Sequence, residues 1–358
     1  MTSEPSDGAA SGPLGVAGAG TVTVLVTAAG SAPAQAFIRG LRAQRELDVR
    51  LVGVDGTRRA GGLFDCEARY TVPRVDDPAF AEAIEGICVA EDVDVLAPIG
   101  NFELEFFAAA APGLRERCGV RVLTNSPAAV ALARDKRASA RRVAAHGVAV
   151  PAYHDPARAA DLRYPVIVKP IVGAGSHGVS LVRGPEDLDP ALRLAGEDAL
   201  VQDFVSGQEY TIDLVVAPDG EVLAAAPRIR VEVRAGQSYK GVTVDDADVE
   251  ESARRCAQAL GLTGQGNVQL IKSDQDGCCY FIEVNPKFAA AMGLTIGAGL
   301  NIPLLYVTLA LGRRPAPEQL RRAPRMWLLR SWEDRVVPES EIEAVPGWDA
   351  ATPPATAR

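Results

Sequence analysis

The chain has 358 residues, which is enough for two or three structural units around substantial cores. Hydrophobic residues make up 47% and charged residues 23%, as in ordinary globular proteins, and the net charge of -9 argues against a nucleic-acid partner. No apolar run reaches the ~18 residues that a membrane span needs, and the N-terminus lacks the features of a signal peptide. We therefore expect a cytoplasmic protein that does not contact a membrane.

The cysteines are scattered along the chain, and none of them forms a C-x-x-C pair. With only 3 histidines in addition, the sequence argues against a zinc site. Reduced, partly buried thiols are the expected state of these cysteines.

In the first part of the chain, β-rich apolar runs alternate with stretches of helical spacing, after a tail at 1–20 that is expected to be disordered. This alternation predicts a parallel sheet with right-handed crossovers, in which ligands bind beyond the carboxyl ends of the strands. The expected strands are 21–27, 49–54, 93–99 and 120–123, and the expected helices are 34–42, 76–91 and 103–117.

A new unit is expected to begin near Ser126-Pro127, and its sequence favours hairpins over βα alternation. The sequence Pro218-Asp-Gly220 is a strong hairpin signal between two apolar runs. The expected helices are 128–145, 249–260 and 302–311, and the expected strands are 166–169, 179–182, 200–204, 209–216, 222–226 and 326–329.

A second hairpin is predicted around the turn-forming run 273–277, and it carries Gln269, Glu283 and Asn285. If residues 269 and 283 lie opposite each other, the turn is centred on Asp276 and the three side chains share one face. One carboxylate and two amide oxygens are hard ligands of the kind that Mg²⁺ takes alongside substrate phosphates. The alternative is an ordinary solvated hairpin face.

Residues 173–178 fit the pattern G-x-G-x-x-G, but a strand follows them, whereas a dinucleotide site requires a helix there. A glycine loop between two strands can instead fold over phosphates and offer backbone N–H groups. Lys169 precedes the loop at the end of an apolar strand, where it needs an anionic partner if it is buried or else extends to the surface. His177 is expected to be a solvent-facing turn residue.

Taken in order, Lys136, Lys169, the glycine loop, Glu209 and the 269/283/285 triad resemble the ATP-grasp superfamily, and more narrowly its carbamoyl-phosphate-synthase-like carboxylate–amine ligases. The resemblance covers roughly residues 21–312. It implies an α/β protein, α+β in its second half, with an ATP-grasp fold behind a Rossmann-like pre-ATP-grasp domain. The implied divisions are a tail at 1–20, the pre-ATP-grasp domain at 21–125, a small lid subdomain at 126–200, a large subdomain with the metal site at 201–320, and a C-terminal strand and tail at 321–358.

The resemblance also implies roles for individual residues. Lys136 and Lys169 would contact the ATP phosphates, Lys169 also the adenine side, and Glu209 would hold the ribose hydroxyls. The mobile lid over the triphosphate would include Gly173, Gly175, Ser176 and Gly178, and the adenine hinge would include Gln202, Asp203 and Phe204. Two Mg²⁺ ions, or Mn²⁺ in their place, would be bound by Gln269, Glu283 and Asn285, with Glu283 bridging.

Two departures from the family pattern lie next to the triad. Family members usually have Arg after Asn-Pro, and this chain has Lys287, which keeps the charge but loses the bidentate fork. Phe288-Ala-Ala-Ala291 stands where relatives are often rich in glycine, which predicts a pocket of different shape.

A basic run follows the 218–220 turn, and in a strand Arg228, Arg230 and Arg234 would share one face. The hypothesis is that Arg228 or Arg230 binds a substrate carboxylate. The alternative is a solvated basic face.

The activity implied by the resemblance is ATP-dependent ligation of a small carboxylate to an amine, with amino acids as natural choices, through an acyl phosphate and with release of ADP and phosphate. Homodimers are common among such relatives. Two alternatives stay open, a carbamoyl-phosphate-synthase-like phosphorylating enzyme and a non-catalytic ATP-binding protein.

Overall fold

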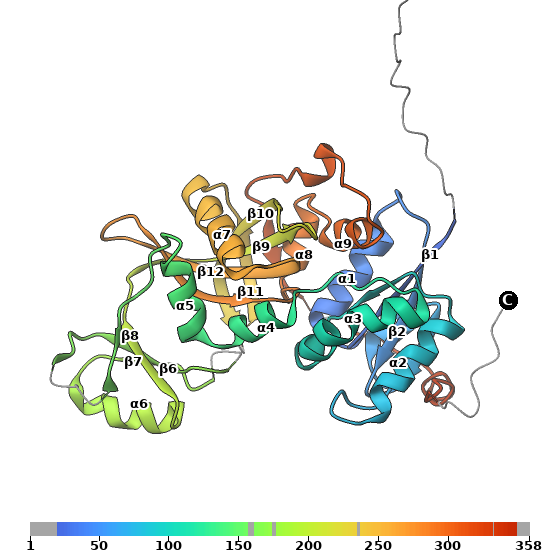
Figure 1. Ribbon diagram of the computed structural model, residues 1–358, viewed down its shortest axis with the longest axis horizontal. Helices are drawn as coiled ribbons and strands as arrows, with labels where there is room; N and C mark the ends of the chain where they lie inside the picture. The colour runs from blue at the N-terminus through green and yellow to red at the C-terminus, as the bar shows by residue number, and fades with distance from the viewer. Residues whose placement is uncertain (1–19, 157–160, 174–176, 235–236, 332, 349–358) are drawn as a thin grey trace, which may run out of the picture.

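The computed structural model describes residues 20–156, 161–173, 177–234, 237–331 and 333–348. In this part of the chain, helices pack around three sheets, which is the mixed α/β architecture that the sequence predicts. Figure 1 shows the first sheet with α2 and α3 at one end of the molecule, the small sheet with α6 at the other end, and the largest sheet between them. None of the described helices is long and apolar enough to cross a membrane.

The first sheet is parallel, as expected, with the order β3-β2-β1-β4. All of β1 is buried, because α1 packs on one face of the sheet and α2 and α3 on the other. The strand expected at 120–123 is reduced to a single bridge between Val95 and Arg121. The elements are β1 Val22–Val26, α1 Ala32–Ala43, β2 Val49–Asp55, η1 Gly61–Asp65, β3 Ala68–Thr71, α2 Ala79–Ala90, β4 Val95–Ala97, η2 Asn101–Glu103 and α3 Leu104–Cys118.

The largest sheet is antiparallel and has the order β13-β12-β9-β10-β11-β14. The tight turn between β9 and β10 contains Gly220 at φ +89°, a conformation that favours glycine. The strand β11 and the helix α8 were not expected from the sequence. The elements are β9 Gly207–Val216, β10 Val222–Arg234, β11 Gln237–Thr243, α7 Ala247–Leu260, β12 Gly264–Ser273, β13 Cys279–Asn285, α8 Met292–Gly297, α9 Ile302–Ala310, η5 Pro317–Leu320, β14 Trp327–Leu329 and α10 Glu339–Glu343.

The small sheet is antiparallel in the order β5-β8-β6-β7, and α6 covers it. Its core is its own, since the buried residues that pack with Val168 all come from this sheet and from α6. The expected boundary at residue 200 falls inside β8, so that the last residues of this strand belong to the small sheet. The elements are β5 Tyr153–His154, β6 Val166–Pro170, β7 Ser180–Val182, η4 Pro185–Asp187, α6 Leu188–Ala195 and β8 Ala199–Asp203.

The single helix expected at 128–145 is two helices, α4 Pro127–Arg134 and α5 Lys136–Ala144. Asp135 between them has an extended backbone, and its carboxylate accepts hydrogen bonds from the N–H groups of Arg137 and Ala138. It therefore caps a new helix instead of continuing the old one. Both helices pack against β13 and α7 of the largest sheet, whereas the sequence placed residues 126–200 together in the small subdomain.

The first sheet and the largest sheet share one hydrophobic core. Phe37 of α1 packs edge-to-face against Phe288 and Tyr306, with ring centroids 5.1 and 5.8 Å away. The buried Tyr306 hydroxyl donates a 2.7 Å hydrogen bond to the carbonyl of Leu96 in β4. These contacts hold the first unit against the segment that follows β13.

Candidate functional site

A cleft of about 760 Å³ opens between the three sheets. Each sheet contributes to its wall, so the cleft depends on the whole fold and not on one motif. Its polar lining includes Lys136, Lys169, Gln202, Glu209, Arg228, Arg230, Asn267, Gln269, Glu283, Asn285 and Lys287, and the loop after β4 adds 99–102.

The predicted hairpin forms one side of this cleft. Gln269 lies directly opposite Glu283, as required for a shared face, and Asn267 lies opposite Asn285. A bulge after Gln269 pairs Leu270 with Phe281, so the chain turns slightly earlier than a turn centred on Asp276 would require. Gln269, Glu283 and Asn285 all line the cleft, and the alternative of an ordinary solvated face is not what the structure shows.

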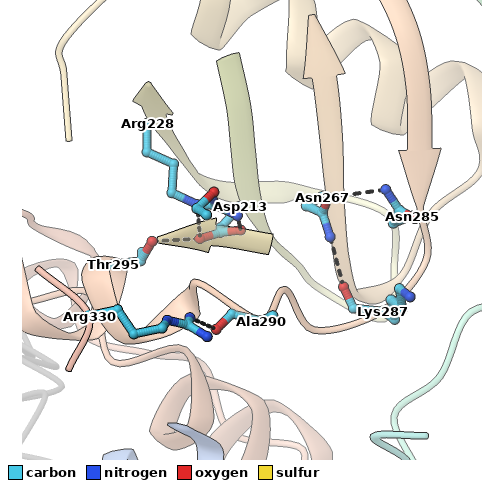
Figure 2. A network of polar contacts seen from close by, with 9 residues as sticks. Asp213, Arg228, Asn267, Asn285, Lys287, Ala290, Thr295 and Arg330 are labelled. Atoms are coloured by element: carbon cyan, nitrogen blue, oxygen red, sulfur yellow. Dashed lines mark hydrogen bonds and ion pairs between the residues drawn. The ribbon is translucent and has the colours of Figure 1, made fainter. Parts of the chain in front are cut away.

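Asn267 is a cleft residue that the sequence analysis missed. It stands two residues before Gln269 in the same strand, so the alternation that grouped the triad was also the signal for a fourth member. The amide of Asn285 donates to Oε1 of Glu283 at 3.1 Å and to Oδ1 of Asn267 at 3.4 Å. The amide of Asn267 donates in turn to the carbonyl of Lys287 at 3.2 Å (Figure 2).

These residues present one carboxylate and several amide oxygens to the cleft. Among the described residues, no three His, Cys, Asp or Glu side chains gather into a group that could hold a metal. A divalent ion here would therefore need oxygens from a bound phosphate in addition. That donor set fits Mg²⁺, which is commonly held by one or two carboxylates together with substrate phosphates.

Two buried lysines face this hairpin from the small sheet and from α5. Lys169 is only 4% exposed, and its burial lowers its pKa to about 8, with Glu283 opposing the shift and Lys136 adding to it. Lys136 is also buried, and its Nζ donates a 2.9 Å hydrogen bond to the carbonyl of Gly173 in the glycine loop. Lys169 is thus a buried cation, not one that extends to the surface.

Lys287 comes from the segment after β13 and is half-buried. Burial lowers its pKa, and the neighbouring carboxylate of Glu283 opposes that shift. The carboxylate of Glu283 acts on the pKa of both Lys169 and Lys287, so the two ammonium groups lie near the same carboxylate. The site is rich in positive charge and suits a polyanionic ligand.

At the expected hinge, Gln202 and Phe204 line the cleft. The side chain of Gln202 is 4% exposed, and its Oε1 has no hydrogen-bond partner among the described residues. A buried acceptor without a donor is costly, so this atom suits a ligand N–H. The side chain of Asp203 turns away and lies 2.5 Å from Nε2 of His154.

The glycine loop borders the cleft through Gly173, His177 and Val179. His177 is exposed, as expected of a turn residue, and Gly178 has φ +72°. Gly175 and Ser176 of the predicted lid lie outside the described residues.

The basic run does not form a solvated face. Arg228 is 3% exposed, and its Nε and Nη2 donate to the carboxylate of Asp213 at 3.1 and 3.2 Å (Figure 2). The hydroxyl of Thr295 donates to the same carboxylate at 2.5 Å. Arg228 therefore sits in a fixed ion pair on the wall of the cleft.

Arg230 also lines the cleft, and its Nη1 lies 2.9 Å from Oε1 of Glu209, the residue expected to hold ribose. The prediction that Arg234 shares this face is wrong. Register shifts on either side of Glu232 turn the strand, and Arg234 is an exposed residue that stacks on Tyr239.

Comparisons with known proteins agree with this geometry. A family model described as "ATP-grasp in the biosynthetic pathway with Ter operon" matches residues 195–330. A solved biotin carboxylase from Campylobacter jejuni is 18% identical with a TM-score of 0.68. The match covers 84% of this chain and 73% of the carboxylase chain. An L-amino acid ligase from Bacillus licheniformis is 18% identical with a TM-score of 0.65. The match covers 84% of this chain and 77% of the ligase chain. The chain thus has the fold of these enzymes, and residues 195–330 are similar to the ATP-grasp family model.

Curated relatives match the sequence over part of their length. The D-alanine–D-alanine ligase of Geobacter sulfurreducens is 30% identical over 201 residues, which are 48% of this chain and 61% of the relative. The carbamoyl phosphate synthase large chain of Xylella fastidiosa is 28% identical over 218 residues, which are 54% of this chain and 20% of the relative. The chain thus spans less than two thirds of the length of these curated relatives.

Proposed function

We propose that this ATP-grasp chain is an ATP-dependent ligase that joins a small carboxylate to an amine and releases ADP and phosphate. The observation that carries the proposal is the placement of Glu283 and its neighbouring amides against Lys136, Lys169 and Lys287 in one cleft. This arrangement neutralises phosphate charge from two sides, which is the main requirement of phosphoryl transfer.

The cleft fits ATP by its size and by its unsatisfied groups. Gln202 offers a buried acceptor suited to an adenine N–H, and Phe204 of the expected hinge also lines the cleft. Gln269, Glu283 and Asn285, together with Asn267, would hold Mg²⁺, which we propose to be two ions. When bound, the metal neutralises charge on the phosphate oxygens during transfer.

A carboxylate is a poor acylating agent, because its leaving group would be an oxide. Phosphorylation turns that oxygen into a good leaving group, and the amine nitrogen then attacks the carbonyl and expels phosphate. Lys136 and Lys169 position the triphosphate, and Lys287 lies beside Glu283 where the transferred group would pass. Closure of the small sheet and its glycine loop would keep water from the acyl phosphate.

The substrates are proposed to be a small carboxylic acid and an amine, with amino acids as candidates. Arg228 or Arg230, which both line the cleft, is proposed to hold a carboxylate. Lys287 in place of the family arginine is the one feature that favours a non-catalytic ATP-binding protein instead, because a lysine lacks the bidentate fork.

Turnover distinguishes the ligase from a non-catalytic ATP-binding protein. ADP and AMP release from MgATP is measured with pooled amino acids and small carboxylates, for the parent, for Glu283→Gln and for the control Glu232→Gln, which is paired with Arg234 and Lys240 outside the cleft. We expect ADP release that requires a substrate pool and that falls roughly 100-fold or more in Glu283→Gln only. Release of AMP would replace the acyl phosphate with adenylation, and the absence of any turnover would favour the binding protein.

A further inference from the structure

Arg330 lies next to two residues that line the cleft, although no sequence motif pointed to it. It follows β14, and its Nη2 donates a 2.8 Å hydrogen bond to the carbonyl of Ala290 (Figure 2). Its Nη1 donates to Oε1 of Gln237 at 3.1 Å. Ala290 and Gln237 both line the cleft, so the guanidinium of Arg330 stands directly behind its wall.

This guanidinium has an unusual electrostatic setting. Both of its acceptors are uncharged, whereas the nearby Arg228 is paired with Asp213, and Arg39 lies 3.9 Å from Glu333. Partial burial lowers the pKa of Arg330, and the positive charges of Arg39 and Arg228 lower it further. Within the described part of the chain, no carboxylate forms an ion pair with this half-buried cation.

We propose that Arg330 binds the side-chain carboxylate of the substrate, a group other than the carboxylate that is phosphorylated, so that the enzyme selects an acidic amino acid. This inference rests on the proposed ligase function and adds the substrate class to it. Arg330 would bind this anionic group, while Arg228 stays paired with Asp213 and the phosphates stay with the lysines.

The chemistry of the two contacts supports displacement by a ligand. A guanidinium has five N–H donors, and among the described residues Gln237 and Ala290 accept two hydrogen bonds from them. The amide oxygen of the exposed Gln237 is a neutral acceptor at the mouth of this corner. A carboxylate that takes its place forms charge-assisted hydrogen bonds, which are about twice as strong as neutral ones.

A purely structural role is the competing explanation, since Arg330 also ties down the carbonyl of Ala290. Arg330→Gln distinguishes the two, because glutamine keeps an N–H donor but removes the charge. Arg234→Gln is the matched control, since it removes an exposed arginine of β10 that lies outside the cleft lining.

The probes are both enantiomers of aspartate and glutamate, each compared with asparagine or glutamine, which have nearly the same shape and lack one charge. Binding is measured as thermal stabilisation of the MgADP-bound protein, and ADP release from MgATP is measured in parallel. In the parent and in Arg234→Gln we expect at least one acid to bind about tenfold more tightly than its amide. In Arg330→Gln that preference should disappear, with the affinity for MgADP unchanged.

Equal binding of acid and amide by the parent, no binding of any of the four amino acids, or an acid preference that survives in Arg330→Gln would overturn the subsite. Acid-selective binding that depends on Arg330 without any ADP release would leave the subsite in place and overturn the ligase. The two proposals therefore fail in different ways.

Discussion

At the scale of single residues, the notable feature of the site is a lysine that is buried before any ligand arrives. Lys169 has its pKa lowered to about 8, first by burial, with Lys136 acting in the same direction and Glu283 against it. A bound phosphate stabilises the charged ammonium and raises this pKa again. Binding of MgATP should therefore be linked to uptake of a proton.

The sign of the linkage gives a direct test. At pH 8 about half of the free protein lacks the Lys169 proton, so binding should take up roughly half a proton per site, and affinity should fall as the pH rises above 8. Titration calorimetry with MgATP in buffers of different ionisation enthalpy measures this uptake. Lys169→Arg, which stays charged, should show no such uptake; an unchanged value in that variant would assign the proton to another group.

Several site residues were predictable because strand alternation and a turn signal fix side-chain direction locally. Gln269, Glu283 and Asn285 were found in this way, and Asn267 followed the same rule but was overlooked. Arg330 was not predictable, because its position at the cleft depends on β14 pairing with the distant β11. A sequence pattern shows that a face is polar, not which remote strand will lie beside it.

At the scale of elements, the break between α4 and α5 positions Lys136, which is expected to contact the ATP phosphates. Apolar spacing runs through 128–145 without interruption, and this is why a single helix was expected. The capping signal was present in Asp135, which ends one helix and begins the next. Lys136 is consequently the first residue of α5, with its Nζ aimed at the glycine loop.

Removal of this cap should therefore affect both stability and nucleotide binding. We expect Asp135→Ala to lower the free energy of unfolding by about 1 kcal/mol and to raise the KM for ATP by roughly tenfold, because Lys136 loses its fixed position. Asp135→Asn keeps a capping side chain and should resemble the parent. Urea unfolding and initial rates measure the two effects.

Ser126 provides the matched control, since its hydroxyl caps α4 by accepting a hydrogen bond from the N–H of Ala129. Ser126→Ala should lose similar stability while the KM for ATP stays unchanged. If both cap variants raised the KM equally, global loosening and not the position of Lys136 would be the cause.

At the scale of the whole molecule, the first sheet and the largest sheet share one core, which we call the fused body, whereas the small sheet has a core of its own. The core around Phe37 joins the first sheet to the largest sheet. The core of the small sheet is formed by residues of that sheet and of α6. The sequence predicted helices at 34–42 and 302–311 but did not reveal that α1 and α9 pack against each other. This explains why the division at residue 125 looked like a domain boundary in the sequence.

The fused body predicts cooperative unfolding across that boundary. Phe37→Ala should destabilise by about 3–5 kcal/mol, because a large cavity opens between Phe288 and Tyr306. Trp348 packs on Tyr70 of the first unit, and Trp327 belongs to β14 of the largest sheet. The Phe37→Ala change is studied in variants that keep only one of these tryptophans, and the two fluorescence midpoints in urea should fall together. Val168→Ala, in the core of the small sheet, should leave both midpoints nearly unchanged and raise only local protease sensitivity. Two separate midpoints in the Phe37 variant would mean that the first unit folds independently, and the cleft would then lie between bodies that can move apart.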